Sequence, residues 1–177
     1  NIFEPRYLAM TEDALGAGRM FAMIQPDEHA PEGETGPALY KVGCLGRLSS
    51  FSETDDGRFL ITLTGVARFT VVNELPMRRG YRRVLGDFTP YLADLDLSPQ
   101  AIGMERDALM TALRAYFGRR GIDPNWDAIR RMPDDALVVT LSMVCPFEPV
   151  EKQALLEART DADRAATPAG AGRRRGP

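Results

Sequence analysis

Histidine and lysine, which many enzymes use as catalytic bases, are scarce in this sequence. It holds one histidine, His29, and only two lysines, Lys41 and Lys152. A serine hydrolase needs a base beside its nucleophile, and a zinc site needs several ligands at close spacing. His29 stands in an acidic stretch without a second histidine, and no phosphate-binding GxxxxGK[ST] motif is present. We therefore expect no catalytic residues, no metal site and no cofactor.

The remaining polar clusters have structural explanations. Asp55-Asp56 belongs to a turn sequence, and Asp134-Asp135 stands at a predicted helix start, where the helix dipole favours negative charge. The one dense basic stretch could meet a nucleic-acid backbone, but an edge strand protected by its charge is the simpler interpretation. It consists of Arg78, Arg79, Arg82 and Arg83.

Size and composition are those of an ordinary globular protein. The chain has 177 residues, of which 44% are hydrophobic and 27% charged, with a formal net charge of −3. This length fits one domain or two small ones. Cys44 and Cys145 have no paired spacing, which favours a reducing cytoplasm over a disulfide scaffold. No apolar run reaches the ~18–20 residues that a membrane-spanning helix needs, so we expect no membrane partner.

The elements that position these residues begin with a short helix and a strand. Residues 5–15 have apolar side chains at helical spacing, among them Tyr7, with proline at the first helical position. Residues 20–24 form a short apolar run typical of a buried strand. Residues 26–38 are acidic and rich in proline and glycine, which predicts a loop.

A β-hairpin is the clearest local signal in the first half. Two β-patterned runs meet at Asp56-Gly57, a strong tight-turn signature. The second run keeps its odd positions apolar from 59 to 71, through Gly65, where a bend or bulge costs least. Residues 81–91 predict one more strand, after a turn marked by Pro76 and Gly80. Long strands that bend at glycine are typical of curled sheets and small barrels.

The second half has helical patterns. Helix starts are predicted at Ser98-Pro99, Asp123-Pro124, Pro133-Asp134 and Glu148-Pro149. The run ALVVTLSMV at 136–144 is apolar all round, so periodicity does not separate helix from strand, but its acidic entry favours helix. The chain thus reads as an α+β protein with a β-rich module at 1–92, a helical module at 98–160 and a disordered tail at 161–177.

Three ordered stretches resemble one known family. NIFEPRYLAM is similar to its Phe-Glu-x-Arg-Tyr segment, and LYKVGCLGRLSSF followed by GRFLITLTGVARFTV to its Val-Gly-Cys and Gly-x-x-Arg-Phe strands. PDDALVVTLSMVCPFEPVEKQALLEA resembles its closing pair of helices. The family is the N-terminal, substrate-binding domain of Lon-type ATP-dependent proteases, and the resemblance covers most of residues 1–160. It implies a PUA-like curled sheet of the pseudobarrel type followed by a C-terminal helical bundle.

The resemblance also shapes two expectations about the ends of the chain. Family members carry a short apolar strand, containing proline, before the Phe-Glu-x-Arg-Tyr segment. That strand is absent here, so we expect the numbered chain to start after it. The basic tail that follows the helical module favours a stand-alone family member without ATPase or peptidase domains.

The function implied is non-catalytic binding of unfolded or extended polypeptide, by strand addition or in an apolar groove. Candidate contact residues are Tyr40, Arg47, Phe51, Arg68, Phe69 and Trp126. Two alternatives stay open. One is a nucleic-acid-binding module, supported only by residues 78–83 and 173–175. The other is an adaptor that docks on a protease or chaperone machine.

Overall fold

The structure is a computed structural model that describes residues 1–96, 105–159, 163 and 165. The chain divides into two compact units, Asn1–Leu97 and Ser98–Pro177.

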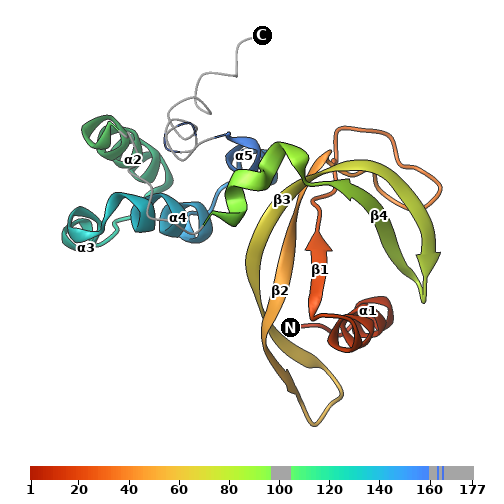
Figure 1. Ribbon diagram of the computed structural model, residues 1–177. Helices are drawn as coiled ribbons and strands as arrows, with labels where there is room; N and C mark the ends of the chain where they lie inside the picture. Colours follow the sequence, from red (N-terminus) through yellow and green to blue (C-terminus); the bar gives the residue numbers. More distant parts are fainter. Residues whose placement is uncertain (97–104, 160–162, 164, 166–177) are drawn as a thin grey trace. The chain divides into compact units, whose positions relative to one another are not determined.

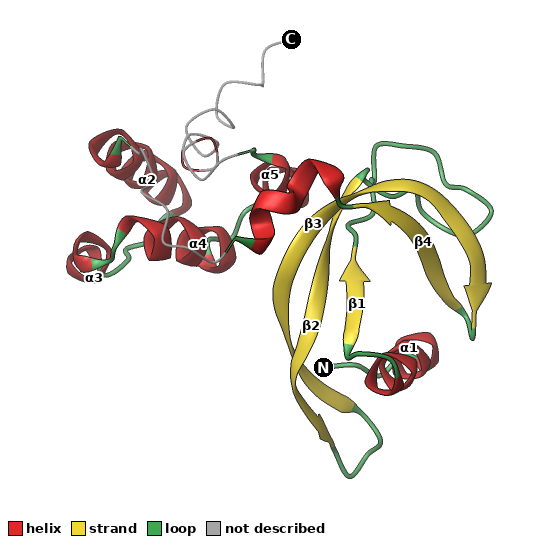
Figure 2. Ribbon diagram, in the orientation of Figure 1, coloured by secondary structure: helices red, strands yellow, loops and turns green. Residues whose placement is uncertain are grey.

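The first unit contains a four-stranded antiparallel sheet in the order β1-β2-β3-β4 (Figure 1). The strands are β1 (Met20–Met23), β2 (Val42–Glu53), β3 (Phe59–Arg78) and β4 (Tyr81–Asp87). Helix α1 (Pro5–Gly16) precedes the sheet and the 3-10 helix η1 (Thr89–Leu95) follows it. Figure 2 shows this mixture of strands and helices, which makes the chain an α+β protein. The predicted hairpin is present, with its turn at residues 54–58.

Irregular pairing changes which face of the sheet each residue occupies. The β2–β3 register shifts between Leu45 and Gly46, where Val66 of β3 is an extra residue. An extra residue inverts the alternation of side chains beyond it. Ile61 therefore lies on one face and Phe69 on the other, so the expectation that the odd positions from 59 to 71 keep one phase is wrong. The bulge does lie next to Gly65, where the sequence predicted it.

Helix α1 packs on one face of the sheet, which we call the inner face. Ala14 of α1 shares a small core with Phe21 of β1 and Leu48 of β2. The helix contacts both β1 and β4, the two edge strands, and Figure 1 shows it between them. Tyr7 is 37% exposed, so it does not belong to the buried stripe expected from the sequence. The buried positions of α1 are Ala9, Thr11 and Ala14.

The opposite, outer face is organised around Phe69. Its side chain is 2% exposed. The ring lies over two neighbouring strands, each of which has a glycine beneath it. A Cβ at Gly43 would come within 2.8 Å of the ring, and one at Gly86 within 2.7 Å. Phe88 completes this packing, with its ring centre 5.5 Å from that of Phe69.

The second unit is helical. Its helices are α2 (Arg106–Arg120), α3 (Trp126–Arg131), α4 (Asp134–Val144) and α5 (Pro149–Glu157). The apolar run at 136–144 is thus a helix, as its acidic entry predicted. Gly121 ends α2 with a positive φ of 65°, a conformation that glycine adopts at no steric cost. The predicted start at Ser98-Pro99 and most of the tail at 161–177 lie outside the described residues.

One arginine connects three of these helices. The Arg106 guanidinium at the start of α2 donates to the carbonyl oxygens of Ile129 at 3.1 Å and of Met132 at 2.9 Å, where α3 ends. It also pairs with Asp134 at the start of α4. The last carbonyl groups of a helix have few intrahelical partners, so this guanidinium adds a donor for them and fixes the α3–α4 turn. The core inside includes Leu113 and Leu137, both 0% exposed.

Candidate functional site

The inner face of the sheet carries large apolar side chains that α1 does not cover. Met23 on β1 is 58% exposed and Leu85 on β4 is 51% exposed. Soluble proteins expose single apolar residues routinely, so exposure alone carries little weight. Here, however, the two residues stand on the two edge strands that flank α1.

The register places Met23 and Leu85 on the same face. On β2, Cys44 and Gly46 are two residues apart and so lie on the same face. Cys44 pairs with Met23 of β1, and Gly46 pairs with Phe21 of β1. Since residues directly opposite each other share a face, Met23 lies on the inner face with Phe21. On β4, Leu85 is four residues from Tyr81 and so shares its face. The Tyr81 hydroxyl donates to Asp13 of α1 at 2.7 Å, which identifies this face as the inner one.

Both edge strands end the sheet. Among the described residues, β1 pairs only with β2, and β4 only with β3. An edge strand presents unpaired backbone N–H and C=O groups that can pair with another extended chain. The inner face therefore combines exposed apolar side chains with open strand edges, which is the chemistry that an extended apolar peptide requires.

Ion pairs fix α1 at one end of the inner face. Arg79 donates to Glu12 at 2.7 Å and to Asp13 at 2.8 Å, and Arg78 lies 3.2 Å from Asp13. The hydrogen bonds from Tyr81 and then Arg79 lower the pKa of Asp13 below its usual value. Arg79 has a positive φ of 48°, which is uncommon for a residue with a Cβ, and its contacts with α1 offset that cost.

The rest of the basic stretch is also engaged within the first unit. Arg82 donates to Glu74 at 2.6 Å and to the carbonyl oxygen of Pro37 at 2.7 Å. Arg83 donates to the carbonyl oxygen of Pro76 at 3.0 Å. These arginines hold the residues 26–38 loop and α1 to the β3–β4 hairpin, which explains the basic stretch without nucleic acid.

Two of the predicted contact residues, Phe69 and Arg68, hold parts of the first unit together. Phe69 is the buried centre of the outer face described above. Arg68 is 8% exposed, and its guanidinium binds both carboxylate oxygens of Asp94 in η1, at 2.8 and 2.7 Å. It also lies 4.7 Å from the ring centre of Tyr91. Arg68 thus anchors η1 on β3.

The other four predicted residues are divided between the two units. Phe51 is 40% exposed, lies on the inner face and packs edge-on against Phe59, with ring centres 5.0 Å apart. Arg47 is exposed on the outer face, opposite Met20 of β1. Tyr40 is half-buried just before β2, and Trp126 belongs to the second unit, packed against Phe117.

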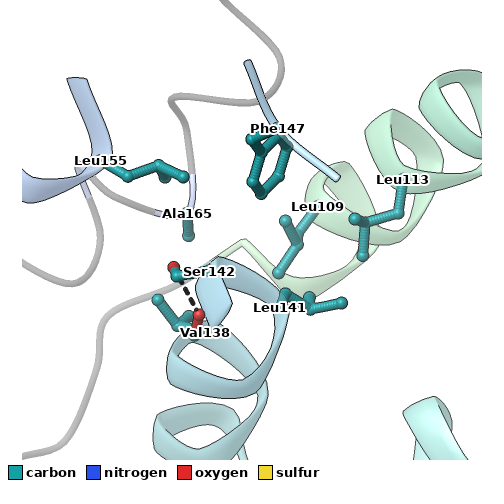
Figure 3. Close-up of a pocket in the computed structure, with 8 residues that line it drawn as sticks. All are labelled: Leu109, Leu113, Val138, Leu141, Ser142, Phe147, Leu155 and Ala165. Atoms are coloured by element: carbon teal, nitrogen blue, oxygen red, sulfur yellow. Dashed lines mark hydrogen bonds between the residues drawn. The ribbon is translucent and has the colours of Figure 1, made fainter. Parts of the chain in front are cut away.

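A small apolar pocket in the second unit is shown in Figure 3. Most of its walls are core residues, and the Ser142 hydroxyl donates to the carbonyl oxygen of Val138 within the same helix at 2.8 Å. With its one hydroxyl engaged and no charged side chain in the lining, the pocket is a packing gap and not a site with chemistry. It is lined by Leu109, Leu113, Val138, Leu141, Ser142, Phe147, Leu155 and Ala165.

Metal binding and membrane insertion find no support in the described part of the chain. No cluster of three or more His, Cys, Asp and Glu side chains there is arranged to hold a metal ion. None of the described helices has the length and apolar character needed to cross a membrane.

Comparison with known proteins decides the family. The family model of the ATP-dependent protease La (LON) substrate-binding domain matches residues 1–167. The chain belongs to this family. This substrate-binding domain family is non-catalytic. Among curated proteins, no sequence matches the chain.

Solved structures of Lon N-terminal domains share the fold of this Lon-type chain. A Lon N-terminal domain protein from Xanthomonas campestris is 17% identical, with a TM-score of 0.60 over 96% of this chain and 85% of that one. The N-terminal domain of the Mycobacterium avium complex Lon protease is 14% identical, with a TM-score of 0.59 over 96% and 86%. At these identities the likeness shows the fold alone.

The Lon-type chain carries exposed residues that its sequence did not single out. Met23 and Leu85 were both expected within strands, but an apolar residue in a strand usually faces a core. Two signals in the sequence could have identified them. β1 and β4 are the first and last strands of the sheet, and methionine is an adaptable side chain at binding surfaces.

Proposed function

We propose that the first unit is a non-catalytic module that binds extended apolar segments of unfolded polypeptide on the inner face of its sheet. The observation that carries the proposal is the exposure of Met23 and Leu85 on one face, beside two open strand edges. Membership of the Lon substrate-binding domain family supports it. ATPase and peptidase chemistry have no part in this proposal.

A finer description of the fold belongs to the same proposal. In it, residues 1–92 form a pseudobarrel in which α1 closes the space between β1 and β4 at one end, and residues 98–160 form a helical bundle. The contacts of α1 with both edge strands support the closure. An extended segment on the inner face would continue that closure beyond α1, burying Met23 and Leu85.

A titration tests the proposal. The ligand is a reduced, carboxymethylated model protein without stable structure, and the same protein in its folded form is the negative control. We expect binding of the unfolded form only. Replacement of an apolar inner-face residue by aspartate, in Leu85→Asp or Met23→Asp, should weaken binding at least about tenfold, because a charge would have to be desolvated.

Val150→Asp provides a matched control. Val150 is 52% exposed, close to the exposure of Leu85, but it lies on α5 of the second unit. We expect it to bind like the wild type. Equal weakening by Leu85→Asp and Val150→Asp, or no binding of the unfolded protein at all, would refute the proposal.

Nucleic acid is the weaker alternative. Arg78, Arg79, Arg82 and Arg83 all have partners within the first unit. Phosphate contacts would have to compete with those partners, and affinity would fall steeply with salt. Binding of single-stranded RNA that weakens in this way would revive the alternative. Docking on a protease or chaperone machine is compatible with polypeptide binding on the inner face.

A further inference from the structure

Met23 places a thioether on the exposed part of the inner face. Its side chain is 58% exposed on β1 and shares the inner face with Phe21. Met20, three residues earlier on the same strand, is 42% exposed but lies on the outer face, opposite Arg47. The two methionines therefore have similar access to solvent, and only Met23 belongs to the proposed binding surface.

A peroxide can convert this thioether to a sulfoxide. The sulfur takes one oxygen from hydrogen peroxide, the O–O bond breaks, and the other oxygen leaves as water. Sulfur is oxidised by two electrons and the peroxide is reduced by two. The thioether has no proton to lose first, so the reaction depends on access to the sulfur atom.

Cys44 is a poorer target for the same oxidant. It lies opposite Met23 on β2 and is half-buried. Burial is the largest cause of the raised pKa of its thiol, and the thiolate is the form that peroxide oxidises. Peroxide at neutral pH should therefore modify Met23 before Cys44.

We infer that Met23 is an oxidation site whose sulfoxide switches off polypeptide binding on the inner face. The inference rests on the proposed function and adds regulation to it. A sulfoxide is polar, so an apolar segment bound over Met23 would have to desolvate the S=O group. The change is reversible, because a sulfoxide reductase returns the thioether and releases the oxygen as water while a dithiol becomes a disulfide.

The experiment oxidises the whole chain with hydrogen peroxide, and peptide mass spectrometry follows each methionine. The oxidised protein then enters the titration with the carboxymethylated unfolded protein. We expect Met23 to oxidise faster than Met10, which is half-buried against the α1 core. Affinity for the unfolded protein should fall about tenfold, and methionine sulfoxide reductase with dithiothreitol should restore it.

Leucine variants identify the methionine that is responsible, because leucine does not react with peroxide. Each protein is compared with itself before and after treatment, so a variant's starting affinity does not enter the result. The dissociation constant should rise about tenfold in Met20→Leu and Met143→Leu, as in the wild type, and stay unchanged in Met23→Leu. Met143 is 77% exposed but lies on α4 of the second unit.

The inference fails, with polypeptide binding intact, on any of three results. Affinity could be unchanged after complete oxidation of Met23, or Met23→Leu could lose as much affinity as the wild type. Met23 could also oxidise no faster than Met10, which would mean that its sulfur is covered in the protein. Absence of binding before peroxide treatment would instead refute the proposed function, and the inference with it.

Discussion

Phe69 and Arg68 are adjacent on β3 and stabilise two different parts of the first unit. Both belong to a Gly-x-x-Arg-Phe motif and were nominated as polypeptide contacts, yet one fills the outer core and the other pairs with Asp94. The partner of Arg68 lies 26 residues further along the chain, and no local pattern links the two. Sequence identifies the motif, whereas burial and pairing decide what its residues do.

A truncation of Phe69 tests its structural role. Phe69→Ala should lower the free energy of unfolding by about 3–5 kcal/mol, because it leaves a cavity over Gly43 and Gly86. Urea denaturation measures the loss. Phe51→Ala is the control, since Phe51 is 40% exposed and should cost much less. A loss at Phe69 no larger than at Phe51 would contradict the packing described.

Asp13 gives the first unit a defined response to pH. Its pKa is lowered in the folded protein by the hydrogen bonds from Tyr81 and Arg79. A carboxylate with a lowered folded-state pKa stabilises the fold above its unfolded pKa, and this contribution disappears as the pH falls through the folded-state pKa. Wild type should therefore exceed Asp13→Asn in stability by more at about pH 7 than at about pH 2.5, in urea titrations at both values. The same difference at both pH values would contradict the ion-pair account of α1.

At the scale of elements, η1 depends on one buried ion pair. Arg68 binds Asp94 through two guanidinium nitrogens and its own backbone N–H. Arg68→Ala would leave Asp94 without its charge partner, so we expect a loss of about 3 kcal/mol of unfolding free energy. Arg68→Lys keeps the charge but loses the two-pronged geometry, and should fall between wild type and alanine. If lysine and alanine cost the same, charge does not contribute to anchoring η1.

The elements also show which parts of the fold a sequence can predict. Asp56-Gly57, Gly121 and Glu148-Pro149 act locally, through turn and helix-end chemistry, and the structure has a hairpin and helix ends there. The sequence predicted the position of the bulge at Val66 but not the face on which Phe69 lies, because that face depends on the register with β2. Likewise, the exposure of Met23 depends on which strands end the sheet, a property of topology and not of local pattern.

At the scale of the whole molecule, each unit holds one cysteine. Cys44 lies in the first unit and Cys145 in the second, and both are free thiols. Burial raises the pKa of Cys145 to about 11 and is the largest cause of a raised pKa at Cys44. A thiol reacts as its thiolate, so both should be alkylated slowly at neutral pH until their own unit unfolds.

Thiol labelling can therefore follow the two units separately. We propose that they unfold independently, since each has its own core. In rising urea, Phe69→Ala should advance the labelling of Cys44 and leave that of Cys145 unchanged, with mass spectrometry reading both sites. A joint shift of the two labelling curves would show one cooperative unit instead.

The central claim, polypeptide binding on the inner face, is tested most directly by photo-crosslinking. Leu85→p-benzoylphenylalanine and Val150→p-benzoylphenylalanine place the same probe at positions of nearly equal exposure, 51% and 52%, on the two units. After irradiation with the carboxymethylated unfolded protein, we predict a crosslinked product from position 85 and little from position 150. Equal yields, or a product from position 150 alone, would contradict the assignment of the binding surface to the inner face.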